Sequence, residues 1–328
     1  MKRSLALLIP LVALPVLVSA CGGDSSDTGV TGPRAVLADR DATGAALANA
    51  WPGLVGETGS DSSITATPAQ VRKGIAYVRP YLDPAFRLQR AGGERYALNN
   101  YVPLDIDAFK VTDVVVTEPR DDIKVVRYRL STPGATAPDT DRVLTGETRP
   151  QLAVFKWDEQ RGHWVIVDHA NFTTPVAAIC GQKPIAVTKE HLKTSAADTA
   201  LGTALVQEWR AITLGKLKKK VTSPQLQIQL ADGQGWPNAK GTPIKWKPAT
   251  SYDVNNLSIT RDGDLLVASY DTMESGLQLE GAAYRSGAAP RLLTYLRDPD
   301  GTWKLIGLAN FAVPQKVPAG VKCESKAS

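Results

Sequence analysis

The sequence lacks the residue patterns of the common catalytic and metal sites. It has only three His and three Cys among 328 residues, and neither a His-Glu-x-x-His nor a Cys-x-x-Cys pattern occurs. The usual sequence signatures of zinc sites are therefore absent. A Gly-x-Ser-x-Gly elbow and a phosphate-binding P-loop are also absent. We therefore expect no metal and no cofactor.

Two further absences bear on fold and partners. Helical and strand patterns do not alternate along the chain, so a parallel sheet of the Rossmann type is not expected. The net charge is only +5, and 22% of the residues are charged, which is ordinary for a soluble globular protein. The densest basic run, Lys216–Lys220, follows a predicted helix and suits its C-terminal dipole. No nucleic-acid partner is expected.

The longest apolar run lies at the N-terminus and is too short to cross a membrane. It covers the 14 residues from Leu5 to Val18, whereas a spanning helix needs about 20. Lys2 and Arg3 precede it, and Val18-Ser19-Ala20-Cys21 follows, which resembles the lipobox of bacterial lipoproteins. The resemblance implies cleavage before Cys21 and acylation of its thiol. The alternative is a plain secretory signal that is cleaved after small residues.

A lipid on Cys21 would attach the protein to a membrane of the bacterial cell envelope. Gly22 follows the Cys in place of Asp, a pattern that resembles outer-membrane sorting in Gram-negative bacteria. We assign residues 1–20 to the signal peptide and 21–34, rich in Gly, Ser, Asp and Thr, to a flexible tether. Cys180 and Cys323 remain as a candidate disulfide in an oxidising compartment, the alternative being two buried or free thiols.

Two stretches of the sequence, residues 150–175 and 290–314, are copies of one unit. Each consists of two apolar runs joined by a polar turn, which predicts an antiparallel hairpin. The copies differ in length by one residue, in the turn, where an insertion does not disturb the strand register. The matching residues are Leu152 and Leu292, Trp164 and Trp303, Asn171 and Asn310, Phe172 and Phe311, and Pro175 and Pro314.

The order of elements before each hairpin also recurs, which predicts two tandem domains, residues 35–185 and 186–328. Each copy has a helix, a strand, a pair of longer strands and then the hairpin, and the first copy carries a second helix after Pro52. The predicted elements of the first copy are helices over 35–51 and from 67 to 82, and strands over 86–90, 111–117 and 123–132. Those of the second are a helix over 199–217 and strands over 223–229, 252–260 and 265–270.

This order predicts an α+β fold and resembles the nuclear-transport-factor-2-like (SnoaL-like) superfamily. The resemblance rests on the paired Trp-containing hairpins, the strands that contain Tyr128 and Tyr270, and the segments Phe86–Gln89 and Leu226–Gln229. It covers most of residues 35–180 and 190–323. It implies two cone-like domains, each a curved antiparallel sheet packed on N-terminal helices. It also implies that the sheets can pair as a pseudo-dimer within the chain.

Asp168, His169 and Tyr128 are the candidate pocket residues. Enzymes that resemble this fold often use an Asp and a His as acid–base partners. Neighbouring strand residues point to opposite faces, however, and the second copy has Gly307 and Leu308 at the positions of Asp168 and His169. A structural role for both is therefore favoured. Four Trp recur in pairs and are expected in the cores, whereas Trp157, Trp236 and Trp246 are not paired and could lie at a surface or pocket.

From these observations we expect a non-catalytic, envelope-anchored protein. Its task would be binding or scaffolding, with either a small apolar ligand in a cone or an envelope protein as its partner. The alternative is an enzyme of the isomerase or hydrolase type that uses a pocket in the first domain only. A third possibility is an accessory role in assembling a secretion or cell-wall complex.

Overall fold

The computed structural model describes residues 32–58, 68–90, 93–101, 103, 106, 108–133, 136–137, 142–143, 148–172, 194–217, 221–237, 245–279, 282–283 and 289–312. The predicted signal peptide, most of the tether, the predicted boundary between residues 185 and 186, and Cys21, Cys180 and Cys323 lie outside these residues. Pro33 and Arg34, the last residues of the predicted tether, belong to the first helix.

The first repeat begins with helices and continues with strands. Its helices are α1 (Pro33–Leu37), α2 (Gly44–Gly56), α3 (Pro68–Val78) and the short η1 (Arg79–Tyr81). Its sheet strands are β1 (Leu82–Arg90), β2 (Arg95–Ala97), β3 (Lys110–Arg120), β4 (Ile123–Ser131), β7 (Arg149–Asp158) and β8 (His163–Asn171). A separate two-stranded ladder joins β5 (Thr136–Ala137) and β6 (Arg142–Val143).

The second repeat has the same order with one described helix. It consists of α5 (Ala196–Thr213) and the strands β9 (Thr222–Leu230), β10 (Gly235–Trp236), β12 (Ser251–Asp262), β13 (Leu265–Ser275), β16 (Ala289–Arg297) and β17 (Trp303–Asn310). A small second sheet holds β11 (Trp246–Lys247), β14 (Gln278–Leu279) and β15 (Ala282–Ala283).

The two large sheets have identical topology. Their strand orders are β2-β1-β8-β7-β4-β3 and β10-β9-β17-β16-β13-β12. The predicted α+β architecture with one sheet for each repeat is confirmed, but the sheets are mixed, because β1 pairs with β8 and β9 with β17 in parallel. The predicted antiparallel sheets thus each contain one parallel pair, because the strand after the helices joins the far strand of the hairpin, and a long intervening chain permits a parallel pair. The strand β8 lies inside the first sheet, between β1 and β7.

The register confirms the alignment of the repeats residue by residue. Asp168 lies opposite Arg87 in the first sheet, as Gly307 lies opposite Gln227 in the second. Gln89 and Gln229, at equivalent positions, make the same hydrogen bonds. The Nε2 of each donates to the carbonyl of the next residue and to a carbonyl five residues on, across a tight turn, at 2.9 and 3.2 Å in the first repeat and 2.9 Å for both bonds in the second.

The predicted helix over residues 35–51 is two helices, of which the second is longer than expected. Thr43 caps α2, its hydroxyl accepting a hydrogen bond from the Ala46 N–H at 3.2 Å. Pro52, expected to end the helix, lies inside it and is buried. Proline removes one intrahelical hydrogen bond, and the apolar burial of the surrounding turns offsets this loss. Among the described helices, none combines the length and apolar character that a membrane crossing requires.

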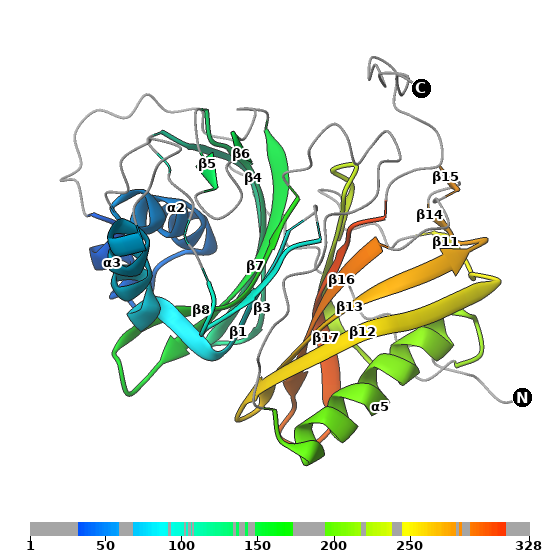
Figure 1. The fold of residues 1–328 in the computed structure, drawn as a ribbon. Coiled ribbons are helices and arrows are strands. Elements are labelled where there is room, and N and C mark those ends of the chain that lie inside the picture. The colour runs from blue at the N-terminus through cyan, green and yellow to red at the C-terminus, as the bar shows by residue number, and fades with distance from the viewer. Residues whose placement is uncertain are drawn as a thin grey trace, which may run out of the picture. The chain divides into compact units, whose positions relative to one another are not determined.

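The described residues form three apolar cores, of which one joins the two repeats. One lies between the helices and the first sheet, a second lies between α5 and the second sheet, and a third joins the opposite faces of the two sheets. Figure 1 shows this order, with the two sheets side by side, α2 and α3 beyond one sheet and α5 beyond the other. Phe172 and Phe311, equivalent residues of the two repeats, stack across the third core with ring centroids 4.2 Å apart. The sheets thus pair as the resemblance implied.

Candidate functional site

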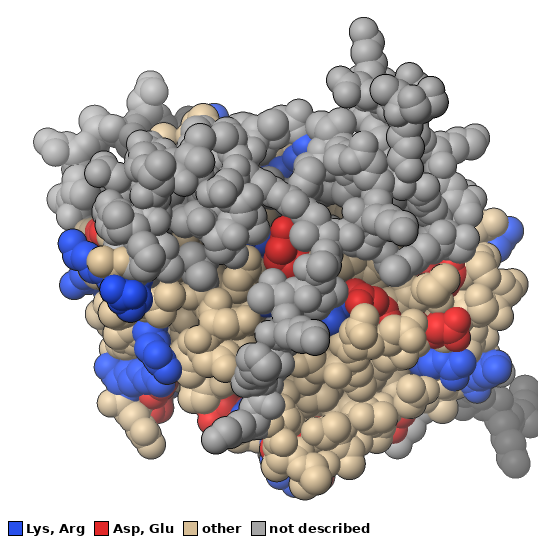
Figure 2. Space-filling model, viewed as in Figure 1, with Lys and Arg blue, Asp and Glu red and all other residues tan. Residues whose placement is uncertain are grey.

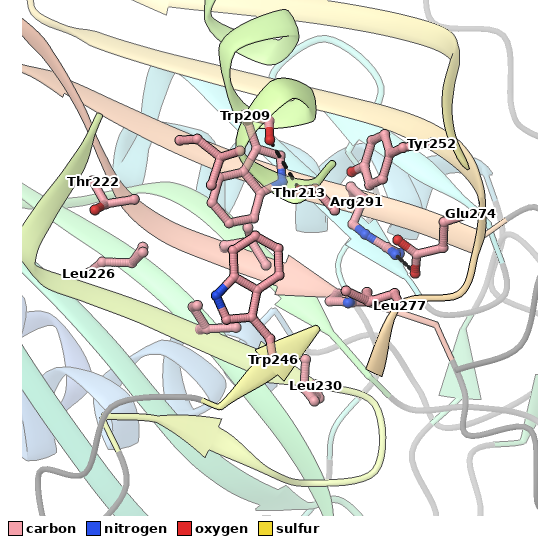
Figure 3. A pocket seen from close by; sticks show the side chains of 14 residues that line it. Trp209, Thr213, Thr222, Leu226, Leu230, Trp246, Tyr252, Glu274, Leu277 and Arg291 are labelled. Carbon is pink, nitrogen blue, oxygen red and sulfur yellow. Dashed lines mark hydrogen bonds and ion pairs between the residues drawn. The ribbon is translucent and has the colours of Figure 1, made fainter. Parts of the chain in front are cut away.

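The candidate site is a pocket of about 260 Å³ inside the second cone. Its wall is mainly apolar and its deep residues are buried, whereas Trp246 is 38% exposed and marks the rim. Figure 3 shows the side chains converging from the helix and several strands. The lining residues are Trp209, Ile212, Thr213, Thr222, Leu226, Ile228, Leu230, Trp246, Tyr252, Glu274, Leu277, Arg291, Leu308 and Asn310.

Secondary-structure periodicity places these residues on one surface. Leu226, Ile228 and Leu230 alternate along β9 and therefore share the inner face of the sheet. Leu308 and Asn310 do the same on the neighbouring strand β17. The last turns of α5 supply the side that faces them, and β11 supplies Trp246. The pocket is thus the space between the helix end and the curved sheet.

A buried ion pair lies in the pocket wall. Arg291 Nη2 donates to Glu274 Oε1 at 2.5 Å, and both side chains are 2% exposed. Arg291 Nη1 also donates to the Pro290 carbonyl at 2.9 Å. The second carboxylate oxygen, Glu274 Oε2, is buried and has no hydrogen-bond partner among the described residues.

Two tyrosines stand beside the ion pair. The hydroxyls of Tyr252 and Tyr270 are 2.8 Å apart and share a hydrogen bond. Burial raises the pKa of both phenols, so they remain neutral under ordinary conditions. The pocket therefore combines an apolar wall with the neutral Tyr252, which Tyr270 supports from behind the lining, and an ion pair of zero net charge.

The lining contains few groups that titrate. No His or Cys is among the lining residues, and Glu274, which is paired with Arg291, is the one carboxylate among them. Within the described part of the chain, no group of three or more His, Cys, Asp or Glu is placed to hold a metal ion.

The structure separates the three residues predicted for a pocket in the first domain. His169 and Tyr128 lie on the helix side of the sheet, with the Tyr128 hydroxyl 3.4 Å from His169 Nε2, which is 2.9 Å from Gln151 Oε1. Asp168 points to the other side, where the Thr294 hydroxyl of the second repeat bonds it. The expectation that Asp168 and His169 cannot be partners is correct.

Among the described residues, the first cone leaves little space beside His169. The space next to His169 and Trp51 is about 20 Å³, room for one water molecule. Tyr101 packs here, with ring centroids 5.2 Å from Phe86 and 6.4 Å from Trp51. Burial lowers the pKa of His169 to about 3, so its imidazole is neutral at ordinary pH.

Sequence reasoning found only part of the pocket in the second repeat. Trp246 was a candidate for a surface or pocket, which is confirmed, whereas Trp157 and Trp236 are buried in the cores. Trp209 was expected in the core by its match with Trp51, but it is half-buried and lines the pocket. The ion pair was missed. Its one signal was a charged residue, Arg291, at an inward position of an otherwise apolar strand.

Comparisons with known proteins give only distant likenesses. No family model matches the sequence, and no curated protein matches it. Among solved structures, a nuclear-transport-factor-2-like protein from Cytophaga hutchinsonii is 16% identical, with 37% of this chain and 100% of that chain covered and a TM-score of 0.27.

Two further solved structures give similar values. A conserved protein from Planctomyces limnophilus is 14% identical over 37% of this chain and 99% of that one, with a TM-score of 0.28. A nuclear transport factor 2-like superfamily protein from Salmonella enterica is 14% identical over 39% and 98%, with a TM-score of 0.23. With TM-scores this low, these likenesses do not identify a function.

Proposed function

We propose that this protein is a non-catalytic binding protein of the cell envelope, which takes a small apolar ligand into the pocket of its second repeat. The pocket supports this proposal because it is concave and largely apolar, with a few polar groups brought together in its wall, the usual composition of a ligand site. Its volume of about 260 Å³ falls near the ~300 Å³ lower end of such sites. The ligand is therefore a small molecule.

The size of the space in the second cone carries the proposal. The described residues leave about 260 Å³ there, against about 20 Å³ beside His169 in the first repeat. An unfilled apolar cavity costs stability, because its lining atoms lose contacts. An apolar space of this size in the second repeat is what a binding role there requires.

Binding of N-phenyl-1-naphthylamine, a neutral fluorophore that brightens in apolar sites, tests the proposal. We expect saturable binding of one fluorophore per chain to the purified protein. Leu226→Trp places an indole at the half-buried rim of the pocket and should abolish this binding. Met273→Trp adds the same ring on β13 at a position that is 50% exposed and outside the pocket, and should leave binding unchanged.

Equal binding by both variants would show that the fluorophore sits elsewhere, and absence of saturable binding in the unmodified protein would contradict the proposed function. Circular dichroism of each variant serves as the check on folding.

The anchor is a separate part of the proposal and rests on the sequence Val18-Ser19-Ala20-Cys21. A diacylglyceryl group on the Cys21 thiol would hold the binding domain at a membrane of the cell envelope, the outer membrane in a Gram-negative cell. Mass spectrometry of the mature N-terminus should find a lipid on Cys21, and Cys21→Ser should release the protein from the membrane fraction. An unmodified mature N-terminus would contradict the anchor and leave the pocket proposal standing.

A further inference from the structure

Glu274 uses only one of its two carboxylate oxygens. Oε1 accepts the hydrogen bond from Arg291, whereas Oε2 is buried and has no partner among the described residues. Glu274 also lines the pocket, as Figure 3 shows. A buried acceptor without a donor is unfavourable and uncommon in folded proteins. The free oxygen therefore indicates a donor that arrives through the pocket.

The charge of the pocket wall limits what this donor can be. Arg291 and Glu274 balance each other, and no other charged residue is among the lining residues. A ligand cation would lie beside the Arg291 guanidinium, and a ligand anion beside the Glu274 carboxylate. Each would also lose its hydration without a counter-charge, which is costly. The balance favours a neutral donor.

The rest of the pocket wall indicates the chemistry of the ligand's apolar part. Leu230, Leu277 and Leu308 are buried apolar residues of the lining. Trp209 and Trp246 add two aromatic surfaces nearer the rim (Figure 3), and aromatic side chains pack well against flat rings. A small ring compound with one polar end fits this distribution.

We infer that the ligand is a neutral hydroxyl compound, a phenol or an alcohol on a small apolar ring body, whose O–H donates to Glu274 Oε2. This inference rests on the proposed function, because it names the ligand class for the same pocket. Its apolar part occupies the space between β9, β17 and the end of α5.

Three probes of one shape separate the alternatives. 2-Naphthol carries a neutral donor, 2-methylnaphthalene carries none, and 2-naphthoate carries an anion. Each competes with N-phenyl-1-naphthylamine for the pocket. A hydrogen bond to a charged group is worth roughly a tenfold gain or more, so we expect 2-naphthol to bind at least about tenfold more tightly than 2-methylnaphthalene. We expect 2-naphthoate to bind more weakly than 2-naphthol by a similar factor.

Two variants of the ion pair assign the preference to Glu274. Glu274→Gln replaces the free oxygen by an amide donor and leaves the Arg291 charge unbalanced, so it should turn the preference towards 2-naphthoate. Removing one partner of a buried pair can unfold a protein. The double variant Glu274→Met with Arg291→Leu avoids this, since apolar replacement of a whole pair is often tolerated. It should bind the fluorophore but no longer distinguish 2-naphthol from 2-methylnaphthalene.

Each outcome has one meaning. If the fluorophore binds and the unmodified protein takes 2-naphthol and 2-methylnaphthalene equally well, the inference is wrong and the proposed function stands. Tightest binding of 2-naphthoate to the unmodified protein would make Arg291 the recognising group and would also overturn the inference. A preference for 2-naphthol that persists in the double variant does the same. If no probe and no fluorophore binds, the proposed function itself fails.

Discussion

Asp168 is an acid enclosed between the two sheets. Its Oδ1 accepts a hydrogen bond from the Val154 N–H at 3.2 Å, and its Oδ2 bonds the Thr294 hydroxyl of the other repeat. No cation forms an ion pair with it among the described residues. Burial raises its pKa to about 8. In the folded protein this carboxyl is therefore protonated at neutral pH.

Asp168→Asn should stabilise the protein, increasingly so as the pH rises from 4 to 8. Because the pKa is raised in the folded protein, the protonated carboxyl makes its full contribution to the free energy of unfolding below the unfolded pKa of about 3.9. This contribution is lost as the pH rises through 8. Asparagine has the shape and the hydrogen bonds of the protonated acid and does not titrate. We expect a gain of roughly 2–4 kcal/mol at pH 8, measured by urea unfolding at several pH values.

The matched control is Asp253→Asn, which removes an exposed carboxylate of β12 and should change stability little at any pH. A gain for Asp168→Asn that is independent of pH would contradict the protonated state of the buried acid.

His169 gives the opposite dependence on pH. Its pKa is lowered to about 3 by burial, so the unfolded chain takes up a proton below about pH 6.5 while the folded protein does not. The stabilising effect is therefore complete above pH 6.5 and is lost as the pH falls towards 3. His169→Leu, the residue of the second repeat, should flatten the loss of stability between pH 6.5 and 4 by roughly 2–3 kcal/mol. His163→Asn, at the half-buried start of β8, is the matched histidine control.

At the scale of elements, a helix packs on a strand through an equivalent glycine contact in each of the two repeats. Gly44 of α2 and Gly202 of α5 each lie directly over a β-branched side chain. A Cβ at Gly44 would stand 2.5 Å from Val116, and one at Gly202 would stand 2.5 Å from Ile259. Glycine is unfavourable inside a helix by about 1 kcal/mol relative to alanine. Its advantage here is that it has no Cβ, which lets the helix approach the sheet closely.

Gly202→Ala should therefore destabilise the protein in spite of the better helix propensity of alanine. Overpacking a core site costs roughly 1–3 kcal/mol, and Ile259 is buried and cannot move aside. In an Ile259→Ala background the same substitution should be neutral or stabilising, which a double-mutant cycle by thermal unfolding measures. Gly53→Ala is the control, because its Cβ would make only ordinary contacts at 3.5 Å. Additive effects of the two changes would contradict the contact.

Much of this element order could be read from the sequence. Alternating apolar residues, turn residues and the matched Trp and Phe positions of the two copies predict the hairpins β7–β8 and β16–β17. The parallel pairing of β1 with β8 could not be read, because pairing between distant strands leaves no local pattern. The course of α2 through Pro52 could not be read either, since it depends on burial of that turn by the sheet.

At the scale of the whole molecule, the sequence cannot show which cone is hollow. His169 and Leu308 occupy equivalent positions, yet Leu308 lines the larger space. Tyr101 packs in the first cone and lies in a connection, not in a matched element. The space inside a cone is set by how distant segments meet, so the sequence left open whether either cone is hollow. The structure shows the pocket of about 260 Å³ in the second repeat.

The two repeats also share polar contacts that fix one sheet against the other. Lys156 of the first repeat bonds Asp262 of the second at 2.7 Å, and Arg95 bonds Asp271 at 2.6 Å. The Thr260 hydroxyl donates to the Ala85 carbonyl at 2.6 Å. Together with the shared apolar core, these contacts mean that each repeat buries one face of the other repeat's sheet. The pocket in the second cone therefore rests on a sheet whose outer face the first repeat covers.

Phe172 and Phe311 test whether the repeats unfold as one. Both rings are buried in the shared core and stack at an interplanar angle of 16°. Each Phe→Ala change should cost roughly 3–5 kcal/mol, and the double variant should show a coupling of about 0.5–1.5 kcal/mol for the ring pair. Because the core is shared, Phe172→Ala should also lower hydrogen-exchange protection of the β16 and β17 amides in the second repeat. Two separate unfolding transitions, with Phe172→Ala moving only one of them, would show that the repeats are independent and that the paired sheets do not support the pocket.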